Sequence, residues 1–280
     1  MKKLNGASVS VIGASHSKSG LCCQDSSLFF SSDKYALAVV ADGHGSSIHF
    51  RSDRGSRYAI KAGQEAIASL MRFGNRTIAK KKDEIIAQTV KHIIVLWNQQ
   101  VEADFLTQPF SPEEMENLSE GDRLRLEKNF VKAYGTTLLL TVCTDKFSFG
   151  LQIGDGDCLV RDFSEEIISP MPEDERLVFN VTTSLCGETA ARDFRTFWLD
   201  SPIQACFLST DGVRNSFSGE EYYRAFAQTV WDDFAASDCE EAKAELSEFL
   251  AKLSAAGSTD DVSVAFFVPE KEEVGSECQE

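Results

Sequence analysis

Long apolar segments are missing from this sequence of 280 residues. No stretch reaches the ~18 consecutive apolar residues that a membrane-spanning helix requires, and the first residues contain no apolar signal core. A dense stripe of basic residues is missing as well: 28 Lys and Arg stand against 44 Asp and Glu, a formal net charge of −16. We therefore expect a cytoplasmic protein that binds neither nucleic acids nor membranes, because nucleic-acid phosphates require clustered Lys and Arg.

Cysteine patterns typical of zinc sites or disulfide frameworks are also missing. The eight cysteines include no Cys-x-x-Cys pair and no Cys/His group at zinc-ligand spacing, so we expect reduced thiols. What the chain does contain is ordinary: 42% hydrophobic and 26% charged residues, the composition of a globular protein. This composition excludes disorder over most of the chain.

Hydrophobic periodicity divides the chain into short strands and amphipathic helices. Helical spacing predicts helices within 46–73 and 83–106 and two more within 219–253, whereas 109–128 is expected to be a loop with a further helical turn. We expect the three strands between 135 and 163 to form an antiparallel meander. The order of elements favours a layered α+β domain over a parallel, doubly wound one. Strands are predicted at 7–14, 27–31, 35–41, 135–142, 146–153, 158–163, 195–199, 206–209 and 262–268.

Four short segments place an aspartate beside a small residue at one end of an apolar run. In a layered sheet fold, strand ends that are distant in sequence can converge at one rim, so we expect these carboxylates to meet. Uncompensated buried carboxylates are costly, so such a cluster indicates a site for hard divalent cations. Oxygen ligands favour Mg²⁺ or Mn²⁺ over Zn²⁺. The segments are Gln24-Asp25-Ser26, Asp42-Gly43-His44-Gly45, Ser209-Thr210-Asp211-Gly212 and Gly257-Ser258-Thr259-Asp260-Asp261.

These segments, together with Gly135-Thr136-Thr137 and Gly154-Asp155, carry a family resemblance. All six occur in the order and approximate spacing of the metal-dependent serine/threonine phosphatases, so the chain resembles the protein phosphatase 2C family over nearly its whole length. Residues 51–56 resemble a compact bacterial-type branch of that family. The resemblance implies a four-layer α-β-β-α sandwich, with two antiparallel sheets flanked by helix pairs. It also implies a single catalytic domain over residues 1–268 and an acidic tail over 269–280.

The activity implied by the resemblance is hydrolysis of phosphoserine and phosphothreonine in proteins. A water that bridges two Mg²⁺ or Mn²⁺ ions would attack directly, without a covalent phosphoenzyme. His44 would be the general acid toward the leaving alkoxide, because the pKa of imidazole lies near neutral pH. A serine/threonine kinase acting on the same targets is the implied partner. Asp42 would bridge both ions, and the implied metal ligands are Asp25, Asp42, the Gly43 carbonyl, Asp211 and Asp260, with Asp155 in a third metal site.

Three positions depart from the family pattern. Gln24 stands where many members have glutamate, and Asn215 supplies a neutral amide at the third metal position. The arginine that commonly precedes the Gln24-Asp25 pair and clamps the phosphate is missing, so Lys18 and His16 are the candidate phosphate-binding residues. These departures support an alternative hypothesis: a catalytically weak or inactive pseudophosphatase that binds phosphoproteins as a regulatory module.

Two other phosphatase chemistries compete with this interpretation. Cys186 and Arg192 have the Cys-x5-Arg spacing of thiol-dependent phosphatases, but Glu188 within that loop and Asp193 after it would repel phosphate. Residues 155–157 have the Asp-x-Asp pattern of aspartyl-phosphate enzymes, yet they fall in a predicted hairpin rather than after a parallel strand. The metal-dependent interpretation is therefore preferred.

Overall fold

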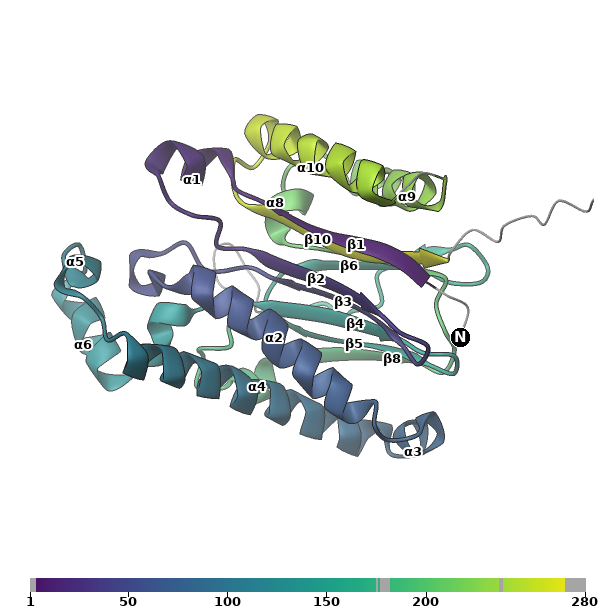
Figure 1. The fold of residues 1–280 in the computed structure, drawn as a ribbon, viewed down its shortest axis with the longest axis horizontal. Coiled ribbons are helices and arrows are strands. Elements are labelled where there is room, and N and C mark those ends of the chain that lie inside the picture. The colour runs from purple at the N-terminus through teal and green to yellow at the C-terminus, as the bar shows by residue number, and fades with distance from the viewer. Residues whose placement is uncertain (1–3, 175, 177–181, 237–238, 270–280) are drawn as a thin grey trace, which may run out of the picture.

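The computed structural model describes residues 4–174, 176, 182–236 and 239–269. Two five-stranded antiparallel sheets lie face to face, and helices cover the outer face of each, which gives four layers (Figure 1). The predicted α+β class and α-β-β-α sandwich are confirmed. Of the predicted acidic tail, residues 270–280 lie outside the described residues, and the single-domain boundary stays a prediction.

Both sheets bring strand ends with aspartate motifs to the edge of the sandwich. The start of β2 lies beside the end of β3, because Ser26 pairs with Ala41, and the start of β6 lies beside the end of β9. The first sheet has the order β1 (Leu4–Val11), β10 (Val262–Pro269), β9 (Ala205–Ser209), β6 (Asp157–Arg161) and β7 (Ile167–Ile168). The second has the order β2 (Ser26–Ser31), β3 (Ala36–Ala41), β4 (Leu138–Cys143), β5 (Ser148–Ile153) and β8 (Arg195–Leu199).

Two helix pairs form the outer layers. The pair α2 (Ser52–Leu70) and α4 (Lys82–Thr107) covers the second sheet, and the pair α9 (Glu220–Ala236) and α10 (Cys239–Ala256) covers the first (Figure 1). No helix among the described residues is both long and apolar enough to cross a bilayer. The remaining helices are α1 (Ala14–Ser19), α3 (Asn75–Lys80), α5 (Pro112–Met115), α6 (Glu120–Lys128), α7 (Ala190–Asp193), α8 (Asp211–Arg214) and the 3₁₀ turns η1 (Ser47–His49) and η2 (Phe130–Tyr134).

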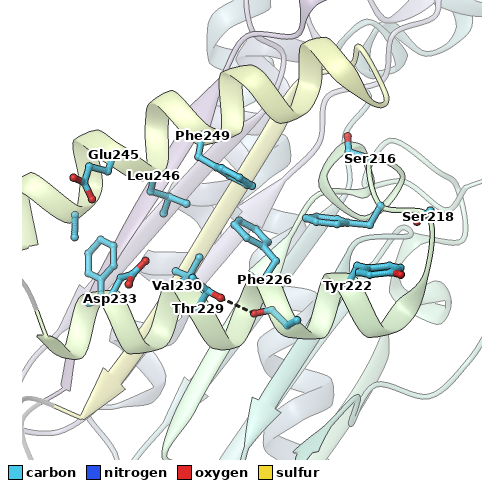
Figure 2. Close-up of a pocket in the computed structure, with 14 residues that line it drawn as sticks. Ser216, Ser218, Tyr222, Phe226, Thr229, Val230, Asp233, Glu245, Leu246 and Phe249 are labelled. Atoms are coloured by element: carbon cyan, nitrogen blue, oxygen red, sulfur yellow. Dashed lines mark hydrogen bonds between the residues drawn. The ribbon is translucent and has the colours of Figure 1, made fainter.

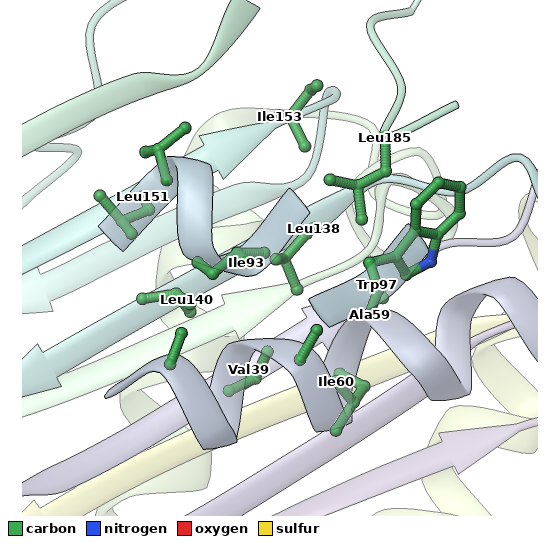
Figure 3. Close-up of a cluster of buried hydrophobic side chains, with 14 of the residues drawn as sticks. Val39, Ala59, Ile60, Ile93, Trp97, Leu138, Leu140, Leu151, Ile153 and Leu185 are labelled. Carbon is green, nitrogen blue, oxygen red and sulfur yellow. The ribbon is translucent and has the colours of Figure 1, made fainter. Parts of the chain in front are cut away.

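Small residues let α2 lie directly on the second sheet. Ala59, Ala62 and Ala66 are buried, and a Cβ atom at Gly63 would stand 3.3 Å from the Leu140 side chain. Apolar side chains of α2, α4 and the central strands fill the space between helices and sheet (Figure 3). Burial of each large apolar side chain there contributes about 1.5–3 kcal/mol. The helix pair and the second sheet are therefore held together by a continuous apolar core.

A buried arginine fixes the segment that follows β3. Arg51 is 1% exposed, and its guanidinium donates to Glu114 at 2.7 and 2.9 Å and to the Tyr134 hydroxyl at 2.7 Å. It also donates to the Gln108 carbonyl at 2.7 Å, and its backbone N–H donates to the Ala133 carbonyl at 2.8 Å. The start of α2 is thus joined to the end of α4 and to η2.

The predicted meander between 135 and 163 is wrong. β4 pairs with β5 in the second sheet, but β6 pairs with β9 and β7 in the first, so the turn at 154–156 carries the chain from one sheet to the other. Gly154 adopts φ 107°, a conformation that favours glycine. Its N–H donates to the Thr183 hydroxyl at 2.8 Å, and Arg195 donates to its carbonyl at 2.5 Å. These contacts come from residues outside the turn and direct the chain to the other sheet. Local hydrophobic periodicity therefore could not predict the crossing.

Candidate metal centre

Five predicted metal-ligand aspartates stand at junctions between elements. Asp25 precedes β2, Asp42 follows β3, Asp155 lies in the β5–β6 turn, Asp211 begins α8 after β9, and Asp260 precedes β10. The Thr210 hydroxyl joins the two sheets here, because it donates to the Asp25 carboxylate at 2.8 Å. Electrostatic interactions link the five carboxylates to one another. The structure therefore brings these residues to one region at the rim of the sandwich.

The Gly135-Thr136-Thr137 motif holds the backbone of Asp42. The Thr136 hydroxyl and the Thr137 N–H both donate to the Asp42 carbonyl at 2.8 Å, and the Asp42 N–H donates to the Thr137 hydroxyl at 2.9 Å. None of these three hydrogen bonds involves the Asp42 carboxylate. The two threonines thus fix the backbone of Asp42, and its carboxyl group interacts with that of Asp211.

Gly43 occupies a place where only glycine fits. A Cβ atom would lie 2.5 Å from the Gln24 carbonyl oxygen and 2.8 Å from the Ser52 carbonyl oxygen, both parts of the backbone. Gly43 also forms an isolated β-bridge with Thr136. The chain before β2 and the start of α2 can therefore close around Asp42 only because this residue lacks a side chain.

Burial and mutual repulsion raise the pKa values of three of the carboxyls. For Asp25 and Asp42 the largest cause is burial, followed among the raising effects by the charges of other aspartates in the group. Burial also raises the pKa of Asp211, with Asp155 as the next cause. The chain thus concentrates negative charge where desolvation disfavours it, and a bound cation would relieve that cost.

The donor chemistry of this group fits a hard divalent cation. Every candidate ligand is an oxygen atom, from carboxylates or the Gly43 carbonyl, as Mg²⁺ and Mn²⁺ prefer. Among the described residues, no three His, Cys, Asp or Glu side chains are gathered closely enough to hold a metal ion as they stand. The fold thus brings the aspartates into one region, but their side chains do not surround a single point. Repulsion between like charges favours such a separation.

Asp260 and Asp261 have different roles, and sequence reasoning found only the first. Asp260 is exposed, and its charge acts on Asp25 and Asp211. Asp261 is buried, and its carboxylate accepts from the N–H groups of Gly13 and Gln24, each at 2.6 Å. The doublet of acidic residues was the available signal in the sequence. Asp261 ties the segments before β2 and α1 to β10, so it positions its neighbour.

The candidate phosphate-binding residues lie near the edge of this region. His16 Nδ1 stands 3.0 Å from the Asp261 carboxylate, so that nitrogen faces a carboxylate rather than an open anion site. Lys18 is exposed in the last turn of α1. Asn215 donates its side-chain amide to Asp211 at 3.0 Å, which orients a predicted ligand. A phosphate-binding role for His16 or Lys18 stays a prediction.

His44 lies beside Gly43 with its ring against a second histidine. The ring centroids of His44 and His49 are 5.0 Å apart in an edge-on arrangement, and the backbone N–H of His44 donates to the Gly135 carbonyl at 3.1 Å. Burial, and then His49, lower the pKa of His44 to about 3. The imidazole is thus neutral at pH 7 in the absence of substrate, which differs from the value near neutrality expected from the sequence.

The thiol alternative does not agree with the surroundings of Cys186. Its side chain is buried, the Ser184 hydroxyl lies 3.2 Å from its sulfur, and burial raises the pKa of the thiol. A nucleophilic cysteine requires the opposite, a lowered pKa and access to substrate. Burial likewise raises the pKa of Asp157 to about 7, and this residue starts an antiparallel strand rather than following a parallel one.

Comparison with known sequences assigns the chain to a family. The profile described as protein phosphatase 2C matches residues 12–251, so the chain belongs to the protein phosphatase 2C family. The predicted enzyme class, a protein serine/threonine phosphatase, is confirmed by this membership. Asp260 lies beyond the matched range, so its place rests on the structure and the motif. No curated protein sequence matches the chain.

Solved structures share the fold at low sequence identity. PppA, described as a key regulatory component of a type VI secretion system (T6SS) in Pseudomonas aeruginosa, is 17% identical with a TM-score of 0.59, covering 95% of this chain and 97% of that one. The catalytic domain of the serine/threonine phosphatase PstP, in complex with two manganese ions, is 16% identical with a TM-score of 0.54, covering 96% and 99%. RsbX in complex with magnesium is 12% identical with a TM-score of 0.50, covering 95% and 96%. These likenesses concern the fold.

Proposed function

We propose that this chain hydrolyses phosphoserine and phosphothreonine in proteins with the help of two Mn²⁺ or Mg²⁺ ions held at the rim of the sandwich. The observation that carries the proposal is the placement of five aspartates from five junctions in one region, within a member of a phosphatase family. Manganese and magnesium are the ions named for PstP and RsbX. The physiological setting we propose is cytoplasmic signalling, with a serine/threonine kinase acting on the same targets.

The residues that would hold the ions are those with oxygen donors. Asp42 and the Gly43 carbonyl would hold one ion, and Asp42, Asp211 and Asp260 the other, with Asp25 alongside and Asp155 at a third, weaker position. When bound, such ions lower the pKa of a water molecule and offset the charge of a phosphoryl group. The oxygen-only donor set and the raised pKa values of the carboxyls support this assignment.

Other residues of the chain would position these ligands, and His44 would donate one proton to the leaving group. The two threonines after Gly135 fix Asp42, Thr210 orients Asp25, and Asn215 orients Asp211. His44 is neutral until substrate arrives. A phosphate dianion beside it would raise the pKa of His44, because a nearby opposite charge favours the protonated ring. The imidazolium could then donate its proton to the leaving alkoxide.

The experiment that tests this function is hydrolysis of a phosphothreonine peptide by the purified protein. Phosphate release is measured with Mn²⁺, with Mn²⁺ and excess EDTA, and with the Asp211→Ala variant. We expect metal-dependent turnover that falls at least ~10²-fold in the variant, because part of the metal clamp is removed. Cys186→Ser is the matched control and should retain normal turnover.

Three results would contradict the proposal in different ways. Turnover that survives EDTA and is lost in Cys186→Ser would establish thiol chemistry instead. Normal turnover in Asp211→Ala would mean that the site is misplaced. No turnover with any of several phosphopeptides, despite metal binding measured by calorimetry, would favour the pseudophosphatase.

A further inference from the structure

An open groove lies between α9 and α10, the helices that cover the first sheet. Its volume is about 750 Å³, within the ~300–1,000 Å³ typical of binding sites. Val230 and Phe234 of α9 and Ala242 and Leu246 of α10 are buried and form its floor. Figure 2 shows side chains of both helices pointing toward the space between them. The groove is thus a concave apolar surface on the outer layer of the molecule.

Aromatic side chains line one part of this groove and stay open to solvent. The ring centroids of Phe217 and Phe226 are 5.4 Å apart, and those of Phe226 and Phe249 are 5.1 Å apart with stacked planes. Phe249 is 44% exposed and Tyr222, on the rim, is 58% exposed. Clustered, exposed aromatic residues beside a pocket are typical of protein interaction sites. The described part of the chain therefore leaves Tyr222 and Phe249 of this aromatic row exposed.

The charges on the groove have one sign. Of the described residues that line it, two are charged, Asp233 on α9 and Glu245 on α10, and both are acidic. They lie at the same end of the groove, on facing walls (Figure 2). Both side chains are exposed, and neither carboxylate has a hydrogen-bond or ion-pair partner within the described part of the chain. An occupant that carries positive charge at this end would therefore be complementary.

This charge pattern decides between the possible occupants. Residues 270–280 of the same chain contain five glutamates and one lysine, so like charges would meet. A second copy is disfavoured for the same reason, because α9 and α10 together carry eight acidic and three basic residues. We propose that the groove docks a cationic amphipathic segment of a partner protein. Its apolar side chains contact Phe226 and Phe249, and its Lys or Arg residues pair with Asp233 and Glu245.

Selection from a phage-displayed library of random 12-residue peptides against the full-length protein tests this proposal. Enriched peptides are synthesised, labelled, and their Kd values measured by fluorescence anisotropy. We expect enriched sequences to combine aromatic or aliphatic residues with Lys or Arg. We expect affinity to fall at least ~10-fold in the double variant with Asp233→Lys and Glu245→Lys. We expect the same loss in Phe249→Ser, because the aromatic contacts and the ion pairs both contribute to binding. Lys243→Glu, on α10 outside the groove lining, is the matched charge control and should bind normally.

The other possible results either support the proposed occupant of the groove or overturn it. Circular dichroism and urea midpoints establish that the variants are folded, so lost binding reports the groove. Absence of enriched peptides, peptides without basic residues, or equal affinity for the double variant would overturn the proposal. A synthetic peptide of residues 270–280 that competes for the groove would identify the chain's own tail as the occupant. Concentration-dependent dimerisation that is abolished in Phe249→Ser would identify a second copy instead.

Discussion

The hydroxyl of Thr210 provides a sharp test of how the metal centre is supported. Thr210 is 1% exposed, and its hydroxyl donates to the Asp25 carboxylate at 2.8 Å while accepting from the Ser263 N–H at 3.0 Å. Replacement by valine keeps the shape of the side chain and removes both hydrogen bonds. A buried charge loses a donor, and a buried N–H loses its acceptor.

The expected cost follows from these two losses. A hydrogen bond to a charged group contributes about 1.5–3 kcal/mol, and a buried unsatisfied group costs about 1–3 kcal/mol. Thr210→Val should therefore lower the free energy of unfolding by about 2.5–6 kcal/mol, measured by urea unfolding followed by circular dichroism in EDTA. Thr210→Ser retains the hydroxyl and should recover most of the loss.

Thr89→Val is the matched control for this prediction. Thr89 is also buried, but its hydroxyl donates at 2.8 Å to the Ile85 carbonyl of its own helix, and that carbonyl belongs to the regular hydrogen-bond ladder. Its replacement should cost less than about 1 kcal/mol, because no polar group is left unsatisfied. Equal unfolding free energies for Thr210→Val and Thr89→Val would refute the reasoning.

Three other predictions concern the loop after β3 and its support. Gly43→Ala should lower stability and reduce turnover at least ~10-fold, because its Cβ would collide with two backbone carbonyls. Gly45→Ala is the control: its Cβ would meet only the Gln24 side chain, at 3.8 Å, so this variant should behave as wild type in the same assays. His44→Ala should slow phosphoserine peptides more than p-nitrophenyl phosphate, since a good leaving group needs little protonation; equal slowing would remove the general-acid role. Burial opposes ionisation of Glu114, but the hydrogen bonds from Arg51 and Ser111 outweigh it and hold the pKa of Glu114 below its ordinary value of 4.5. This carboxylate therefore stabilises the fold above pH 4.5, and the stabilisation is lost as pH falls through the lowered pKa. The urea midpoint of wild type should therefore decrease between pH 6 and pH 3.5 more than that of Glu114→Gln, and parallel decreases would contradict the assignment.

Each sheet packs one face against a helix layer and the other face against the second sheet. This packing requires apolar residues at regular positions, so much of the fold could be predicted from the sequence. The run 195–199 predicted as a strand coincides with β8, and the two helices predicted within 219–253 are α9 and α10. The meander failed because the pairing of β6 with β9 joins residues about 50 positions apart, beyond the reach of local periodicity. Short helices such as α1 contain too few residues to show a helical period.

The candidate site was predicted from motif order, and the structure adds what supports it. The aspartates could be named from the sequence, since each follows or precedes an apolar run. The role of Asp261 could not, because its partners Gly13 and Gln24 are more than 230 residues away. The pKa of His44 likewise depends on burial and on His49, which only the folded chain determines.

The central claim is that the carboxylates at the rim form a centre for two metal ions with Asp42 between them. Isothermal titration calorimetry of Mn²⁺ into the metal-free protein tests it directly, with Asp42→Ala and the distant Asp232→Ala as the compared variants. We predict binding of at least two ions per chain in wild type and in Asp232→Ala, and loss of both high-affinity events in Asp42→Ala. Unchanged Mn²⁺ binding in Asp42→Ala, or no binding to wild type, would contradict the account.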